Sequence, residues 1–162
     1  MDAAYVALGS NIAPQRHLPE AVRRLARLGR VRGASRVYRT APWGYADQPD
    51  FLNAVVALES TAEPLALLET LLALETEMGR ERTIPNGPRT IDLDLLLWGA
   101  RIVVTPRLTL PHPRLHRRAF ALVPLCDLAP HLRHPVLGRT MAELLAPLDR
   151  SGVRDAPLEL PV

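Results

Sequence analysis

The stretch from Gly87 to Gly99, GPRTIDLDLLLWG, constrains this chain more than any other. Asp92 and Asp94 alternate in it with apolar residues, as on a strand whose side chains two apart share a face about 6.6 Å apart. The pattern predicts two carboxylates side by side, with apolar side chains on the opposite face. Because buried carboxylates repel each other and lose hydration, they need cations or hydrogen-bond donors nearby. Two Mg²⁺ ions shared with phosphate groups would supply that charge.

An edge strand with one hydrated face would show the same Asp-x-Asp pattern. The residues that follow the acids, from Leu95 to Trp98, are apolar without a break. An uninterrupted apolar run is typical of a strand that is covered on both faces. We therefore expect a covered strand, and the two acids are its candidate functional site.

Length and composition favour one globular domain over residues 1–162. The 162 residues suffice for a sizeable core, and no apolar run approaches the roughly 20 residues that span a bilayer. The first residues lack the basic and then apolar segments of an export signal. A single cysteine, Cys126, excludes an internal disulfide. These features predict a cytoplasmic location and no membrane partner.

All 20 basic residues of the chain are arginines, and the net charge is +3. A Walker A loop requires Lys, so P-loop phosphate chemistry is excluded. Any polyphosphate must be held by Arg, whose planar guanidinium suits bidentate contacts with phosphate.

Hydrophobic periodicity predicts strands at residues 3–8, 31–38 and 52–58 and along the aspartate stretch. Helices are expected from near Pro19 to Leu28 and from Pro64 to about Met78, the second with an apolar stripe of Leu65, Leu68, Leu71, Leu72 and Met78. Further helices are expected at 115–128 and 142–148. Glu75 lies near the centre of the stripe, where it could reach solvent or face a ligand.

This order predicts an α+β, ferredoxin-like fold, a βαββαβ antiparallel sheet with helices on one face and a C-terminal helical appendage. We expect loops and ligand to cover the open face. The loop at residues 39–50 is long for a compact domain, and it carries Trp43 and Tyr45. It is either an aromatic-anchored surface loop or a ligand lid.

Four stretches together resemble the 6-hydroxymethyl-7,8-dihydropterin pyrophosphokinase family of folate biosynthesis. They are ALGSN at 7–11, YRTAPWG at 38–44 with DQPDFLN at 47–53, GPRTIDLD at 87–94, and LPHP at 110–113 with RAF at 118–120. They occur in the expected order and spacing over residues 7 to about 125.

The resemblance implies transfer of a pyrophosphoryl group from ATP to the hydroxymethyl oxygen of the pterin, giving AMP. It implies that Asp92 and Asp94 bind two Mg²⁺ ions and act in catalysis with Arg80 and Arg89. The implied pterin contacts are Thr40, Ala41, Trp43, Phe51, Asn53 and Phe120, with the two phenylalanines stacked on opposite faces of the pterin. The implied ATP contacts are Glu75, Arg82, Arg89, Leu95, Arg107, Thr109, His112 and Arg118. The expected partners are these two small molecules, with no nucleic acid, and we expect a monomer.

Two other functions remain open. The sequence pI of about 9.7 would suit an RNA-binding ferredoxin-like domain, which needs aromatic and basic side chains on its sheet. Aromatic residues make up only 4% of the chain, and the aspartates would repel RNA phosphates. A metal-dependent phosphohydrolase could use the same acids. His112 and His116, four residues apart, are weak candidates for metal ligands without a third partner.

Overall fold

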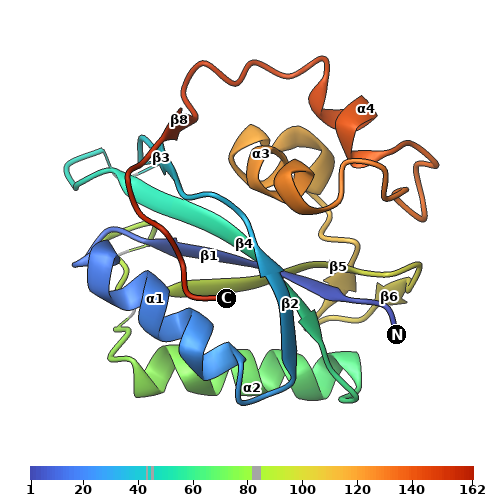
Figure 1. Cartoon of the computed structure of the whole chain (residues 1–162), viewed down its shortest axis with the longest axis horizontal. Coiled ribbons are helices and arrows are strands. Elements are labelled where there is room, and N and C mark those ends of the chain that lie inside the picture. The colour runs from blue at the N-terminus through green and yellow to red at the C-terminus, as the bar shows by residue number, and fades with distance from the viewer. Residues whose placement is uncertain (43, 45, 82–84) are drawn as a thin grey trace.

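The computed structural model describes residues 1–42, 44, 46–81 and 85–162. A six-stranded antiparallel sheet lies between two layers of helices (Figure 1). The sheet contains β1 (Ala4–Ser10), β2 (Arg30–Ala34), β3 (Tyr38–Thr40), β4 (Phe51–Glu59), β5 (Asp92–Trp98) and β8 (Arg154–Asp155), and a separate hairpin contains β6 (Val103–Val104) and β7 (Thr109–Leu110). The helices are α1 (Pro14–Leu25), α2 (Pro64–Glu77), α3 (Ala119–Leu128) and α4 (Met141–Leu145), with a 3-10 turn, η1 (Leu115–Arg117), before α3.

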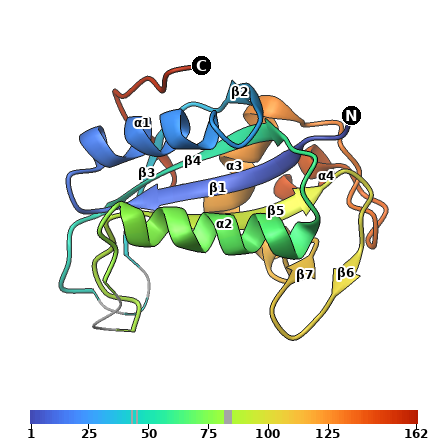
Figure 2. The ribbon, with the colours of Figure 1, turned by 90° about the horizontal axis from the view of Figure 1, so that it is seen from below.

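The strand order confirms the ferredoxin-like prediction. The strands run β5-β1-β4-β3-β8, and β2 pairs with β4 beside β3. The two βαβ halves thus place the first and last strands of the motif, β1 and β5, next to each other. Helices α1 and α2 cover one face of the sheet, as Figure 2 shows from their side. Val6 and Leu8 of β1 and Leu93 of β5 point into that layer.

The opposite face is covered by helices, so the expectation of loops and ligand alone was wrong. Helices α3 and α4 pack there on a second core that includes Tyr5, Val55 and Leu97 of the sheet. Leu122 and Leu125 of α3 are completely buried in it. The C-terminal appendage is therefore the third layer of the domain. Among the described residues, no helix is long and apolar enough to cross a membrane.

Several predicted boundaries were wrong for local reasons. Helix α1 begins at Pro14, which takes the first helical position, where the missing N–H has no helical partner, and Pro19 lies inside the helix. The predicted strand at 31–38 is divided into β2 and β3. Ser35 interrupts it, since its hydroxyl, in place of a backbone carbonyl, accepts the amide of Val55 at 2.8 Å. The helix expected at 115–128 is likewise divided, and the last helix is shorter than predicted.

The prediction of the apolar stripe of α2 was partly wrong. Leu71 and Met78 are buried as predicted, whereas Leu65 is 40% exposed. The buried side of the helix follows Leu67, Leu71, Leu74 and Met78, at the spacing of a single helical face. Glu75 lies beside this face and is buried with it.

Candidate active site

The sheet face beneath α3 is hollowed because the side chains of β1 become smaller along it. Tyr5, Ala7 and Gly9 alternate on this face, from a large aromatic residue to none. In the sheet register, Gly9 lies between Asn53 of β4 and Asp92 of β5. A Cβ atom at Gly9 would lie 3.1 Å from Asn53 Oδ1, so the glycine keeps the floor of the hollow low.

Two hollows meet at this point. The first, the sheet-face hollow, is lined by residues that include Ala7, Gly9, Asn53, Asp92, Asp94 and Phe120. The second, the hairpin hollow, has a volume of about 240 Å³ and is lined by residues that include Asp94, Leu95, Arg107, Thr109, His112 and Pro113. Asp94 lines both hollows, so a group bound in one can approach a group bound in the other.

The prediction that Asp92 and Asp94 share one face is confirmed. They pair with Gly9 and Ala7 across the sheet and line the same hollow, while Leu93 points into the core beneath α1 and α2. Both acids lie on the face of the sheet beneath α3, because side chains two residues apart on a strand point to the same side. The two carboxylates are thus held side by side by the pleat of β5.

The charge of Asp94 is poorly compensated. Burial, together with the nearby charges of Asp92 and Glu75, raises the pKa of Asp94 to about 7. The cations of Arg118 and Arg80 oppose this rise only in part. The nearby cations thus do not offset the burial and the neighbouring carboxylates.

The acids therefore fit a cation that arrives with a phosphate. Mg²⁺ commonly uses one or two carboxylates and completes its coordination with water and phosphate oxygens. Among the described residues, no group of three or more His, Cys, Asp or Glu side chains could hold a metal ion. This also leaves His112 and His116 without the third ligand that a protein-only site would need.

Strand β5 lies at the edge of the sheet, and two of its backbone groups are bonded to residues outside the sheet. The amide of Leu93 donates to Glu75 Oε2 at 2.7 Å, and the carbonyl of Leu96 accepts the amide of His112 at 2.7 Å. Leu95 to Trp98 are buried, which confirms the expectation of a covered strand for this half. An edge strand held in this way presents its acids in a fixed position.

Arg80 connects the end of α2 to the first acid. Its Nη1 donates to Glu75 Oε2 at 2.7 Å and to Asp92 Oδ1 at 2.9 Å, and its side chain is 8% exposed. Among the described residues, its buried Nε has no hydrogen-bond partner. Glu75 Oε2 thus accepts from both Arg80 and the amide of Leu93, and this links the end of α2 to β5.

The residues expected at the pterin lie on β3 and β4 and at the start of α3. Asn53 Nδ2 donates to Thr40 Oγ1 at 2.6 Å, which fixes the amide at the floor of the sheet-face hollow. Phe51 is buried, and the guanidinium of Arg89 lies 5.0 Å from the centre of its ring. Phe120 is 40% exposed at the rim of the hollow. Ala41 is exposed at the start of the loop.

Four of the residues expected at the nucleotide line the hairpin hollow, namely Leu95, Arg107, Thr109 and His112, whereas Glu75, Arg89 and Arg118 do not line it. Burial and the cations of Arg118 and Arg114 lower the pKa of His112 to about 4. His112 is therefore neutral near pH 7. Arg107 forms an ion pair with Glu69 of α2.

Two predicted contacts, Trp43 and Arg82, lie outside the described residues. The sequence reasoning gave no role to Ala7 and Gly9, which form the floor between the two acids and Asn53. Their signal was the decrease in side-chain size along an otherwise apolar strand, which marks a place where something else must fill the space.

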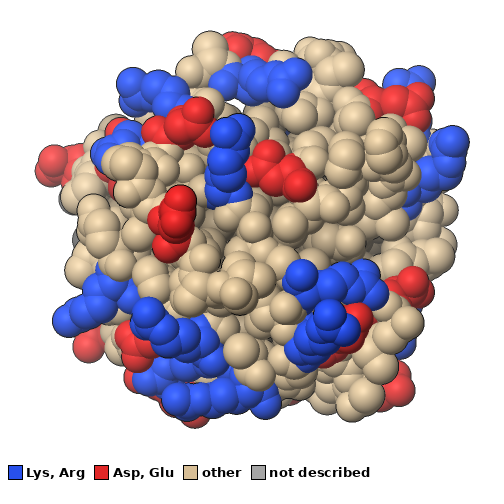
Figure 3. All heavy atoms as spheres, in the orientation of Figure 1, with Lys and Arg blue, Asp and Glu red and all other residues tan. Residues whose placement is uncertain are grey.

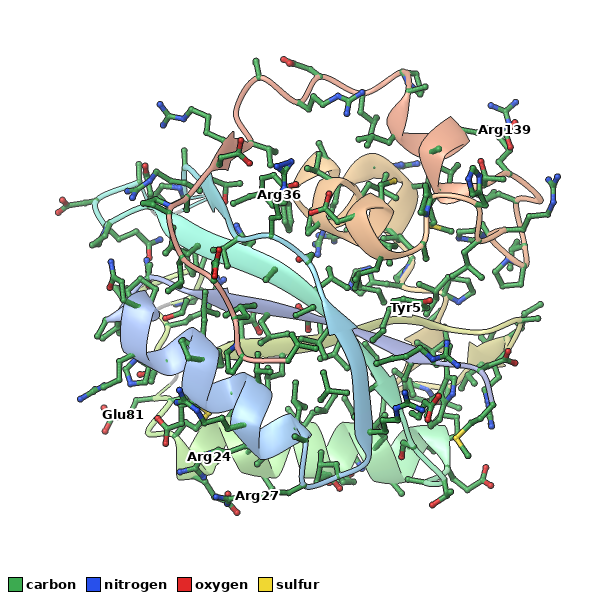
Figure 4. The ribbon with its side chains drawn as sticks, in the orientation of Figure 1. Tyr5, Arg24, Arg27, Arg36, Glu81 and Arg139 are labelled. Atoms are coloured by element: carbon green, nitrogen blue, oxygen red, sulfur yellow. The ribbon has the colours of Figure 1, made fainter. Side chains whose placement is uncertain are left out.

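The sheet offers no support for the RNA-binding alternative. RNA-binding ferredoxin-like domains stack bases on an open sheet face, whereas α3 and α4 cover that face here. The visible face of the molecule carries basic and acidic side chains interspersed (Figure 3). Arg24 of α1 and Arg27, just after that helix, lie on the side away from the sheet (Figure 4), and Arg24 pairs with Glu20 and Glu77. These arginines lie on a solvated side of the molecule and form no RNA-binding surface on the sheet.

A comparison with known protein families settles the assignment. The family model described as 7,8-dihydro-6-hydroxymethylpterin-pyrophosphokinase (HPPK) matches residues 5–130 of the chain. This match includes both hollows and both acids. The chain belongs to the HPPK family.

Individual relatives agree with this HPPK assignment. The chain is 47% identical to the 2-amino-4-hydroxy-6-hydroxymethyldihydropteridine pyrophosphokinase of Pseudomonas aeruginosa, over 94% of this chain and 96% of that protein. It is 45% identical to the enzyme of the same name from Methylorubrum extorquens, over 94% and 98% of the two chains. A crystal structure of Plasmodium falciparum HPPK-DHPS superposes with a TM-score of 0.72 at 16% identity, covering 89% of this chain and 41% of that one. That likeness supports the HPPK fold.

Proposed function

We propose that the hairpin hollow binds ATP, that the sheet-face hollow binds 6-hydroxymethyl-7,8-dihydropterin, and that the reaction takes place where they meet. As an HPPK, the enzyme transfers pyrophosphate from ATP to the hydroxymethyl group of the pterin and releases AMP. The observation that carries the arrangement is that Asp94 lines both hollows. The phosphates of a nucleotide in one hollow would then face an acceptor hydroxyl in the other.

The nucleotide side is apolar at one end and cationic at the other. Leu95 and Pro113 offer apolar surface to the adenine, while Thr109 and neutral His112 can exchange hydrogen bonds with it. Arg107 lines the hollow together with Asp94, and Arg118 interacts electrostatically with Asp94 and Asp92, so we expect both to accompany the triphosphate. Burial lowers the pKa of Arg118, and the charges of Asp94 and Asp92 raise it, so these carboxylates help to keep that guanidinium charged.

The sheet-face hollow presents groups that suit a flat, polar heterocycle. Asn53, held by Thr40, presents amide hydrogen-bonding groups at the floor, and Phe120 presents a ring at the rim. Phe51 would stack on the other side of the pterin once the guanidinium of Arg89 leaves its ring for a phosphate. Offset stacking between two phenylalanines would fix the plane of the pterin, and thereby the direction of its hydroxymethyl group.

Asp92 and Asp94 are proposed to hold two Mg²⁺ ions together with the phosphates. When bound, the ions neutralise the charge that phosphoryl-type transfer concentrates on the phosphate oxygens. The part of this chain is positioning: β5 holds the acids in register, and Glu75 holds Arg80 against Asp92. Arg80 and Arg89 then lie where they can contact the transferred pyrophosphate.

Release of AMP from ATP tests this function directly. The purified chain, ATP, Mg²⁺ and 6-hydroxymethyl-7,8-dihydropterin should yield AMP and the pterin diphosphate in equal amounts. Omission of the pterin should abolish AMP formation, and EDTA should abolish it with all substrates present. Nucleotide hydrolysis at the same rate without pterin would instead establish the phosphohydrolase alternative.

We also infer that residues 1–162 work as a single-domain monomer in the cytoplasm. The three layers pack on one sheet, and the two hollows are built entirely from this one chain. Light scattering coupled to size-exclusion chromatography should give the mass of one chain, and a mass of two chains would contradict the monomer.

A further inference from the structure

Asn11, directly after β1, is bonded to two loops at once. Its side chain is buried, and it hydrogen-bonds to Gln48 and Pro49 in the loop before β4 and to Arg89 in the loop before β5. Both loops carry proposed substrate contacts, since one leads to Phe51 and the other ends at Arg89. Asn11 itself lines neither hollow, so any influence on the reaction must pass through these loops.

The first connection is to the backbone of Arg89. The amide of Arg89 donates to Asn11 Oδ1 at 2.8 Å, and the amide of Asn11 donates to the carbonyl of Arg89 at 3.1 Å. Both backbone groups of Arg89 are therefore held. The side chain of Arg89 is 23% exposed, and its guanidinium lies over Phe51 and 3.6 Å from Asp92. The held backbone makes Arg89 a pivot about which its side chain can turn.

The second connection is to the loop before Phe51. Asn11 Nδ2 donates to Gln48 Oε1 at 2.7 Å and to the carbonyl of Pro49 at 3.1 Å. Gln48 Nε2 in turn donates to the carbonyl of Asn86 at 2.7 Å. The hydrogen bonds thus connect Arg89 through Asn11 and Gln48 to Asn86, which lies in the same loop as Arg89. Together they form a ring.

Each amide in this ring has one defined orientation. The backbone amide of Arg89 requires an oxygen at Asn11 Oδ1, and this places the donor Nδ2 toward Gln48. Gln48 must then accept with Oε1 and donate with Nε2. The loops also touch at Gly44, where a Cβ atom would lie 2.9 Å from Asn86 Nδ2, so the approach of the two loops is close.

We propose that Asn11 is a positioning residue that holds Arg89 in a fixed relation to Phe51, so that turnover depends on it. The proposal rests on the proposed roles of Arg89 and Phe51. A misplacement of about 1 Å can lower a rate by about 10²-fold. A ring of hydrogen bonds that fixes the backbone near Arg89 and Phe51 can therefore have a measurable effect on kcat.

The chain offers an isosteric substitution that breaks one side of the ring. Asn11→Asp keeps the acceptor for the amide of Arg89 but replaces the donor that faces Gln48 Oε1 and the carbonyl of Pro49. Gln48→Glu is the complementary change, since it keeps the acceptor for Asn11 and removes the donor to Asn86. Gln15→Glu, at an exposed position of α1, makes the same chemical change away from the site and is the control.

The decisive measurement is a double-mutant cycle on kcat with Arg89→Ala. Asn11→Asp should lower kcat about tenfold or more in the otherwise native enzyme, and should have little effect when Arg89 is already Ala. Gln48→Glu should follow the same pattern with a smaller fall, and it carries the cycle if Asn11→Asp does not fold. Gln15→Glu should leave kcat unchanged. An unchanged kcat in Asn11→Asp, or an equal factor in both backgrounds, would overturn the positioning role.

Hydrogen exchange separates this proposal from the proposed function. Asn11→Asp should speed amide exchange in residues 46–50 and 86–90 while β5 stays protected as in the native enzyme. This result does not require turnover, so an inactive native chain would refute the function and leave the ring testable. Native exchange rates in both segments would refute the ring itself.

Discussion

The two halves of β5 face opposite demands within one strand. Leu96 to Trp98 are buried between the two helical layers and line neither hollow. Asp92 and Asp94 belong to the same strand, but their side of the sheet opens into the hollows, and the Asp92 side chain is 27% exposed. Both halves pair with β1, with a register shift in the apolar half between the Tyr5–Leu97 and Val6–Leu95 pairs. The difference therefore comes from what covers the strand.

The apolar half supplies the rigidity that the acidic half uses. Two carboxylates held close together repel each other, and an isolated strand end would relieve this by fraying. Here the strand is held by the core on both faces, by Glu75 at the amide of Leu93 and by His112 at the carbonyl of Leu96. Within the seven residues of β5, the apolar half thus contributes mainly to stability and the acidic half mainly to function. Substitutions in the two halves should therefore have different effects.

Asp94→Asn should give the largest effect of any change in the strand. It keeps the shape of the side chain but removes a charge from the proposed Mg²⁺ site, and we expect kcat to fall by about 10²–10³-fold. Asp92→Asn should act similarly. The fold should remain intact, because like charges no longer repel each other. Steady-state AMP release and thermal melting check this, and native-like turnover in either variant would defeat the two-metal role of that residue.

Leu97→Ala should show the converse in the apolar half. Leu97 is completely buried, and such a truncation typically lowers the free energy of unfolding by about 2–5 kcal/mol. Turnover per folded molecule should stay near the native value, because Leu97 lines neither hollow. Urea unfolding measures the loss. Leu65→Ala, the same change at an exposed position of α2, should alter stability by less than about 1 kcal/mol.

The pH dependence of the free energy of unfolding should reveal the raised pKa of Asp94, which burial and the neighbouring carboxylates cause. The pKa of Asp94 is about 7 in the folded chain, against about 3.9 for an unfolded aspartate, so the folded state binds this proton more tightly. Without metal, the contribution of Asp94 is therefore fully present at low pH and is lost as pH rises toward 7. Asp94→Asn lacks this titration, so its stability advantage over the native chain should grow by on the order of 1–3 kcal/mol between pH 5 and 8. Urea unfolding in EDTA measures it, and a constant difference would contradict the assignment.

How much of this could be predicted from sequence depends on the range of the interaction. The shared face of Asp92 and Asp94 follows from the two-residue period of a strand, which is a local property, and the prediction was confirmed. The position of Glu75 near an apolar stripe was also visible. Its partners were not, because Arg80 and the amide of Leu93 meet it only when the end of α2 packs beside β5.

The covering of the second face could have been predicted more fully. Helix α3, AFALVPLCDL, is apolar on nearly every side, and a helix of that kind is buried rather than laid on the surface. The boundaries of α1 and β2 failed for another reason. Pro14 and Pro19 are equally acceptable near a helix start, and the role of Ser35 depends on Val55, twenty residues away. Long-range pairing decided both the hollows and these boundaries.

Phe120→Ala should give the smallest of the expected effects, and it tests the rim above the acidic half of β5. Phe120 lines the sheet-face hollow with Asp92 and Asp94 but is 40% exposed, so the fold depends little on it. Loss of a stacking ring and its buried area should weaken pterin binding by roughly tenfold, about 1.4 kcal/mol. ATP binding should hardly change, because the residue lies outside the hairpin hollow. Calorimetric titration of each ligand, with Phe120→Leu as a variant that keeps apolar bulk without the ring, distinguishes stacking from simple burial. Equal losses for both ligands would show that the rim supports the whole site rather than the pterin side alone.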